Sequence, residues 1–208
     1  MSERRSLSLL DRGIAQIAMV VEDLDRTVER YHRTFGIGPW HFYTYGRPLL
    51  KRMTYHGRPA SYRMRLALTY FGPTRIELIE LVEGKTVYGD FVSEHGYGVQ
   101  HLGVLVDDMD AALAEARAAG FTMLMDGAGF GLDGDGHFAY LDTEKDYGFM
   151  LELIERPKRR VPPERVYPPE QSSGAGVDDL IDGSTANAST DNPAVSGRER
   201  TWPAPRSE

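Results

Sequence analysis

The sequence predicts an α+β fold built from two β-α-β-β-β modules, because one pattern of strands and a helix occurs twice. "GIAQIAMVVEDLDRTVERYH" and, about 85 residues later, "GVQHLGVLVDDMDAALAEAR" each run from an apolar strand through an Asp-rich turn into an amphipathic helix. "IELIE" at 76–80 and "LELIE" at 151–155 close the two stretches. Matches at both ends of the unit, in the same order, indicate an internal duplication.

The first module is predicted from alternating apolar residues and β-branched runs. A helix at 24–35 follows the first strand, with Asp23 as its expected N-cap and Gly36 as its stop signal. The strands are expected at 14–21, 40–45, 62–70 and 75–82.

The second module repeats this order, with a helix at 109–119 that Gly120 ends. Its strands are expected at 100–106, 121–125, 137–142 and 149–154. "TVYGDFVSEHGYG" between the modules predicts a short helix and a loop. The chain thus divides into a first module (10–84), a linker (85–97), a second module (98–156) and a Pro-rich tail (157–208).

The tail holds eight of the chain's 12 prolines, with many Ser, Gly and Asp residues. Such a segment buries too little apolar surface to offset the entropy lost on ordering, so residues 170–208 are expected to be disordered. The part up to Pro169 is expected to lie along the surface in an extended form.

The composition excludes several classes of protein. The formal net charge of -7 argues against nucleic-acid binding. No apolar run approaches the roughly 20 residues that span a bilayer, and the start has no apolar segment typical of a secretory signal. The chain contains no cysteine, which excludes disulfides, thiolate metal sites and a cysteine nucleophile. A cytoplasmic protein without membrane contact is expected.

Four polar residues share strand faces with small or apolar neighbours: Gln16, Glu77, His101 and Glu152. Two carboxylates on apolar faces without a partner would cost several kcal/mol. A divalent cation is a natural partner, and three oxygens with one imidazole nitrogen suit Zn, Ni, Co or Mn.

These residues and the repeat resemble the vicinal oxygen chelate superfamily, the glyoxalase, bleomycin-resistance and extradiol dioxygenase group, over residues 12–156. The resemblance implies that two βαβββ modules pair into a curled mixed sheet around a cleft, with Gln16, Glu77, His101 and Glu152 as metal ligands. It implies a Lewis-acid metal and proton transfer by Glu152 or Glu77, through an enolate, next to a carbonyl group. The substrate would be a small carbonyl compound or an acyl-CoA, and a homodimer is possible.

The subclass stays open between an epimerase and a glyoxalase-type lyase. A Gln/Glu/His/Glu set is similar to glyoxalases, whereas methylmalonyl-CoA epimerases usually have His at the position of Gln16. "LDTEKDYGFMLELIE", with ten residues between Leu141 and Glu152, resembles the epimerases instead. The catalytic Glu of those epimerases has no clear equivalent between the second and third strands. An acyl-CoA epimerase is the leading hypothesis.

Two further classes are alternatives. A ring-cleaving dioxygenase usually needs two His and one carboxylate around Fe(II), so iron is the less expected metal. A protein that sequesters a drug or aromatic ligand would lack the ligand set.

Substrate contacts are expected from the aromatic and basic stretch after the first helix. Alternation separates Trp40 and Phe42 from His41, Tyr43 and Tyr45, and the Trp40 and Phe42 face is the one chosen for the cleft. Arg63 or Arg65 is expected to meet an anionic substrate.

The remaining charged and glycine-rich features are given surface roles. Glu80 and Glu155 alternate away from the ligand positions and are interpreted as solvated. "GFGLDGDGH" is expected to form a turn or lid near the cleft. "RPKRR" (156–160) is interpreted as solvated, with contact to a phosphate-bearing substrate as the alternative.

Overall fold

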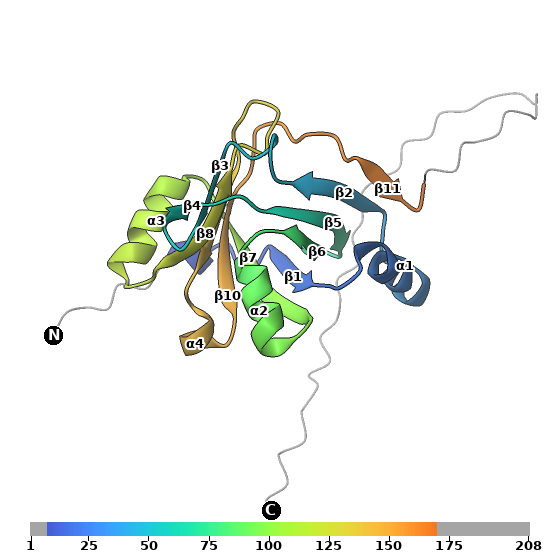
Figure 1. Ribbon diagram of the computed structural model, residues 1–208, viewed down its shortest axis with the longest axis horizontal. Helices are drawn as coiled ribbons and strands as arrows, with labels where there is room; N and C mark the ends of the chain where they lie inside the picture. The colour runs from blue at the N-terminus through green and yellow to red at the C-terminus, as the bar shows by residue number, and fades with distance from the viewer. Residues whose placement is uncertain (1–7, 170–208) are drawn as a thin grey trace, which may run out of the picture. The chain divides into compact units, whose positions relative to one another are not determined.

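The computed structural model describes residues 8–169, in which eleven strands form one mixed sheet (Figure 1). The strands of the first half are β1 (Gln16–Val20), β2 (Trp40–Tyr45), β3 (Arg52–Tyr55), β4 (Arg58–Pro59), β5 (Arg63–Phe71) and β6 (Thr74–Glu83). Those of the second half are β7 (Gly98–Val106), β8 (Met123–Ala128), β9 (His137–Leu141), β10 (Met150–Glu155) and β11 (Arg165–Tyr167). The helices are the 3-10 turn Ser8–Leu10, α1 (Leu24–Phe35), α2 (Val87–His95), α3 (Met109–Ala118) and α4 (Glu144–Tyr147).

The strand order shows the duplication directly. It runs β11-β2-β5-β6-β1-β7-β10-β9-β8-β3-β4, so β2-β5-β6-β1 is the mirror image of β7-β10-β9-β8. The first strand of each module lies at the centre, where β1 and β7 pair antiparallel. Each is parallel to the last strand of its own module, β6 or β10. The predicted α+β fold of two paired βαβββ modules is confirmed.

The sheet curls strongly. β2 and β9 are six strands apart in the order, which would separate them by about 29 Å in a flat sheet. The rings of Tyr45 on β2 and Phe138 on β9 nevertheless stack with centroids 6.2 Å apart. These rings belong to the largest core cluster, which fills the concave face. α1 and α3 pack on the opposite face of their own modules, against residues such as Leu78 and Leu153.

The helix ends explain the repeated closing motifs. Asp23 and Asp108 cap α1 and α3 by accepting from a backbone amide inside each helix, and Gly36 ends α1 in a left-handed conformation at φ 67. Glu80 accepts from the Leu24 amide at 3.0 Å, and Glu155 accepts from the Met109 amide at 2.9 Å. The interpretation of Glu80 and Glu155 as solvated residues is therefore wrong, since both bind otherwise unpaired amides at helix N-termini.

The modules also exchange edge strands. The β3-β4 hairpin comes from the first half but pairs with β8 of the second, and β11 follows the second half but pairs with β2 of the first. β11 lies in the stretch that was expected to be extended along the surface. Figure 1 shows the chain crossing from β10 to β11 along one edge of the curled sheet. The predicted disorder of 170–208 concerns residues outside the described range.

α2 lies in the predicted linker, and its central position beside β7 is visible in Figure 1. None of the helices within residues 8–169 has the length and apolar content needed to cross a bilayer.

A buried carboxylate fastens the β3-β4 hairpin to β8. Asp126 Oδ2 lies 2.8 Å from Arg52 Nη2 and 2.8 Å from His137 Nε2, and its other oxygen accepts from the Thr54 hydroxyl. Burial alone would raise the pKa of Asp126, but the hydrogen bonds from His137 and Thr54 and the charge of Arg52 lower it below the ordinary 3.8.

Replacing this carboxylate by an amide is expected to weaken the fold in a pH-dependent way. Because the folded-state pKa is lowered, the ionised Asp126 stabilises the protein above about pH 4, and this contribution is lost as the pH falls through the lower folded-state value. Asp126→Asn should reduce the free energy of unfolding by about 1–3 kcal/mol at pH 7. Urea unfolding at a series of pH values should show the difference from wild type narrowing in acid. An equal difference at pH 3 and pH 7 would contradict this assignment.

Candidate metal centre

Four adjacent strands carry the centre. β6, β1, β7 and β10 are neighbours in the sheet, and each contributes one side chain to the centre on the concave face. The structure brings together all four residues predicted from the sequence, Gln16, Glu77, His101 and Glu152. None is more than 8% exposed. The strand register brings these side chains together, because Ala18 of β1 pairs with Glu77 of β6 on one side and with His101 of β7 on the other.

Two carboxylates and an imidazole form the core of this group. His101 Nε2 lies 3.2 Å from Glu152 Oε2 and 3.5 Å from Glu77 Oε2. One donor atom from each of the three residues lies within 4.8 Å of the others. His101 Nδ1 lies 2.6 Å from Gln100 Oε1, and a proton donated there leaves Nε2 facing the carboxylates. This donor set fits a divalent cation.

The electrostatics of the centre also favour a cation. Burial lowers the pKa of His101, but Glu152 and Glu77 outweigh burial and raise it to about 9. A proton on His101 therefore compensates part of the buried negative charge. A divalent ion at the same place would supply the positive charge instead.

Two tyrosines that the sequence analysis did not single out complete one side. The Tyr140 hydroxyl donates to Glu152 Oε1 at 2.9 Å, and the hydroxyls of Tyr88 and Tyr140 are 2.7 Å apart. Burial and the nearby Glu152 raise the pKa of both tyrosines well above the ordinary value, so they remain protonated donors. Strand alternation places Tyr140 on the same face as Phe138, a signal the sequence does contain.

Gln16 presents its nitrogen, not its oxygen, to the carboxylates. Its Nε2 lies 2.9 Å from Glu77 Oε2 and 2.8 Å from Glu152 Oε2, while its Oε1 accepts from Arg75 Nε at 2.5 Å. Turning the amide over would place an NH₂ group against the Arg75 guanidinium. The predicted role of Gln16 as a ligand would require that turn and stays a prediction. Glu77, His101 and Glu152 need no such rearrangement.

Gly103 makes room for the centre. A Cβ atom there would lie 2.9 Å from Gln16 Cβ and 3.1 Å from Glu152 Oε2. Only a residue without a side chain allows both neighbours to approach β7 so closely.

The residues expected to bind substrate lie elsewhere. Trp40 and Phe42 are buried on the opposite face, in the cluster that packs against α1. Arg65 binds Asp25 and Glu80, and Arg63 pairs with Glu83. This corrects the choice of strand face, because alternation along β2 brings His41 and Tyr43 to the concave side instead.

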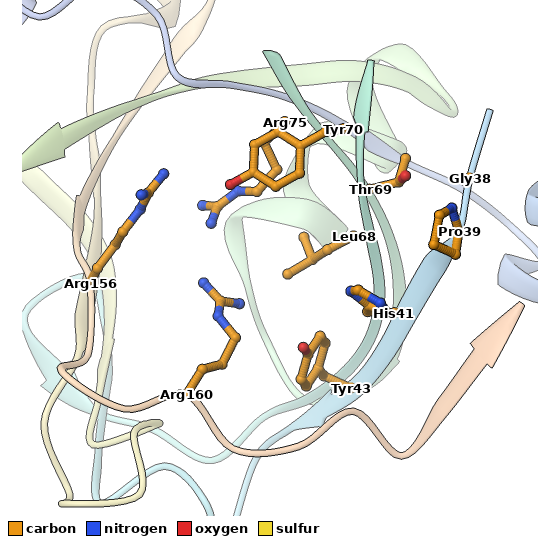
Figure 2. Close-up of a pocket in the computed structure, with 10 residues that line it drawn as sticks. All are labelled: Gly38, Pro39, His41, Tyr43, Leu68, Thr69, Tyr70, Arg75, Arg156 and Arg160. Atoms are coloured by element: carbon orange, nitrogen blue, oxygen red, sulfur yellow. The ribbon is translucent and has the colours of Figure 1, made fainter. Parts of the chain in front are cut away.

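A pocket of about 340 Å³ lies on that concave side, next to Arg75 (Figure 2). Its wall includes His41, Tyr43 and Leu68, and Arg156 and Arg160 line it from the stretch after β10. The interpretation of "RPKRR" as solvated holds for Arg156, which is exposed, but not for Arg160, which is half-buried; both line the pocket. Arg75 could have been found from the sequence, since it lies two residues before Glu77 on the same strand face.

Comparison of the sequence with models of known protein families identifies one family. The family model described as the Glyoxalase/Bleomycin resistance protein/Dioxygenase superfamily matches residues 15–140. No curated protein matches the sequence.

Solved structures of methylmalonyl-CoA epimerases share the fold. A variant of the Streptomyces coelicolor enzyme in complex with 2-nitronate-propionyl-CoA is 22% identical, with a TM-score of 0.51, over 72% of this chain and 97% of that one. The enzyme from Mycobacterium tuberculosis is 20% identical, with a TM-score of 0.52, over 77% of this chain and 95% of that one.

Proposed function

We propose that this chain, which belongs to the Glyoxalase/Bleomycin resistance protein/Dioxygenase superfamily, is a metal-dependent isomerase or lyase that moves a proton on the carbon next to a carbonyl group. The observation that carries this proposal is the buried group of Glu77, His101 and Glu152 beside an open pocket. Buried carboxylates without structural ion pairs to Lys or Arg are costly, so a chain retains them where chemistry needs them.

The three residues would hold Zn, Ni, Co or Mn, and such an ion supplies a Lewis acid that stabilises negative charge on a carbonyl oxygen. Glu152 is the residue proposed to accept the proton, with Glu77 as the second candidate. Tyr140 and Gln16 donate to the two oxygens of Glu152 and hold its carboxylate in one orientation. The low exposure of the cluster keeps water from competing for the proton.

An acyl-CoA thioester is the substrate class we propose first, as in an acyl-CoA epimerase. The Streptomyces coelicolor epimerase that shares this fold was solved with an acyl-CoA analogue. A glyoxalase-type lyase uses the same step next to a carbonyl and is the alternative within this function. A ring-cleaving dioxygenase is disfavoured because the cluster has one imidazole and two carboxylates, the reverse of the usual iron set.

Metal content tests the proposal against a binding protein without a metal. Protein purified without chelator from metal-supplemented cells is expected to carry about one divalent ion per chain, by elemental analysis. His101→Ala should remove most of it, whereas His95→Gln, at a partly exposed histidine of α2, should not. Wild-type protein with less than about a tenth of an equivalent would overturn the proposed function in favour of ligand sequestration.

A further inference from the structure

Three guanidinium groups from distant parts of the sequence meet in the pocket. Arg75 comes from β6, while Arg156 and Arg160 come from the stretch that follows β10. Figure 2 shows all three directed into the pocket, opposite His41 and Tyr43. Arg160 also lies over the Tyr43 ring, 5.8 Å from its centroid. One pocket therefore collects three positive charges on a chain whose net charge is negative.

None of these three arginines has an acidic partner within residues 8–169. Arg75 donates its Nε to Gln16, which leaves its two terminal nitrogens without an acceptor in that part of the chain. Other arginines within residues 8–169 form salt bridges with acidic side chains, such as Arg159 with Asp133 and Arg63 with Glu83. Converging guanidinium groups without carboxylates repel one another, and an anion between them removes that repulsion.

The arginine-bearing stretch is held in place by the glycine-rich loop before β9. Gly131 forms a β-bridge with Arg160, and the Leu132 amide donates to the Arg159 carbonyl at 2.9 Å. The Lys158 amide donates to Asp135 at 2.8 Å. The loop predicted to be a turn or lid thus acts as an anchor, which fixes the backbone beneath Arg160.

The pocket adjoins the proposed reaction centre through one side chain. Gln16 contacts Arg75 with its oxygen and both Glu77 and Glu152 with its nitrogen. Tyr43 and Leu68 give the pocket an apolar wall, which favours an organic ligand over a bare inorganic ion. We propose that Arg75, Arg156 and Arg160 bind an anionic group, carboxylate or phosphate, of a small organic substrate. The binding rests on the pocket alone, and the orientation of the substrate toward Glu152 rests on the proposed function.

The test measures anion binding in the absence of metal, so it is independent of turnover. Full-length protein is freed of metal with a chelator, dialysed and titrated by calorimetry with malonate, with inorganic phosphate and with malonamide, the neutral isostere of malonate. At low salt, malonate or phosphate is expected to bind with a Kd below about 10 mM, and malonamide is not. The tighter of the two anions identifies the charged group of the substrate.

Matched variants assign the binding to these arginines. The double variant Arg156→Gln/Arg160→Gln should raise the Kd by at least about tenfold. Lys158→Gln removes a charge from the same run outside the pocket and should change the Kd by less than about twofold. Arg156→Gln alone, at an exposed residue, provides the answer if the double variant does not fold. Equal binding of malonamide, no anion binding by wild type, or unchanged Kd values in variants that fold would overturn the proposal. If wild-type protein binds malonate but carries no metal when purified without chelator, the anion site stands while the proposed function fails.

Discussion

Glu152→Gln is expected to lower turnover by about 10²-fold or more, the usual effect of removing a general base. The amide keeps the shape of the side chain and one oxygen, but it cannot take up a proton as a carboxylate does. The amide oxygen can still accept from the Tyr140 hydroxyl, whereas the new NH₂ group faces the Gln16 nitrogen and that hydrogen bond is lost; the fold should survive the loss of one hydrogen bond. The rate is measured as deuterium uptake from solvent next to the carbonyl, with acyl-CoA and 2-oxoaldehyde substrates. Metal content measured on the same samples should fall less than turnover.

Glu155→Gln is the matched control, because Glu155 lies in the same strand but on the opposite face. Its carboxylate accepts from the Met109 amide at the start of α3. A neutral oxygen can still accept that bond, so turnover should stay within about twofold while the melting temperature falls slightly. An inactive Glu155→Gln beside an active Glu152→Gln would exclude Glu152 as the base.

Glu77 is distinguished from Glu152 by its partners. Both carboxylates receive the Gln16 amide, but only Glu152 also receives a tyrosine hydroxyl, from Tyr140. The second donor fixes the direction in which Glu152 faces. Glu77→Gln should therefore reduce metal content and turnover to a similar extent, whereas Glu152→Gln should reduce turnover much more than metal content.

The sequence predicts the parts of this protein that depend on short-range patterns. Asp23 and Gly36 mark the ends of α1 because an N-cap and a left-handed glycine act within one helical turn. Gln16, Glu77, His101 and Glu152 could be placed on one face because strand alternation repeats every two residues, and the duplication sets the two strand pairs side by side. The helix ends required no knowledge of distant contacts, whereas the meeting of the four polar residues at one centre was implied by the resemblance to the superfamily.

The features that escaped prediction depend on contacts between distant residues. Glu80 meets the Leu24 amide 56 residues away, and no local pattern distinguishes it from a solvated carboxylate. β3 alternates polar and apolar residues over only four positions, too few to identify a strand, and it becomes one by pairing with β8 of the other module. Arg156 and Arg160 belong to a basic run whose sequence does not distinguish them from solvated residues. Their position at the pocket depends on contacts between residues 158–160 and the glycine-rich loop before β9. The choice between the two faces of β2 was likewise beyond the sequence, since both carry aromatic residues.

Trp40→Ala is expected to lower the free energy of unfolding by about 3–5 kcal/mol, the range for removing a large buried aromatic side chain. Trp40 is fully buried, its Nε1 donates to the Ile37 carbonyl at 2.8 Å, and its ring meets the Tyr31 ring edge-on at 5.9 Å. Truncation would leave a cavity between β2 and α1. Urea unfolding gives the loss directly, and the folded variant should retain its metal content and anion binding.

Tyr70→Ala is the contrasting variant, because Tyr70 lines the pocket and is 56% exposed. Its loss should change the free energy of unfolding by no more than about 0.5 kcal/mol, as for most surface positions. The two variants thus distinguish the face of the sheet that packs against α1 from the face that meets the ligand. Had Trp40 been a substrate contact, its truncation would weaken the binding of malonate or phosphate while leaving the unfolding free energy nearly unchanged. That result would reverse the assignment of the two faces of β2. It would also contradict the proposal that the ligand binds in the pocket lined by the three arginines.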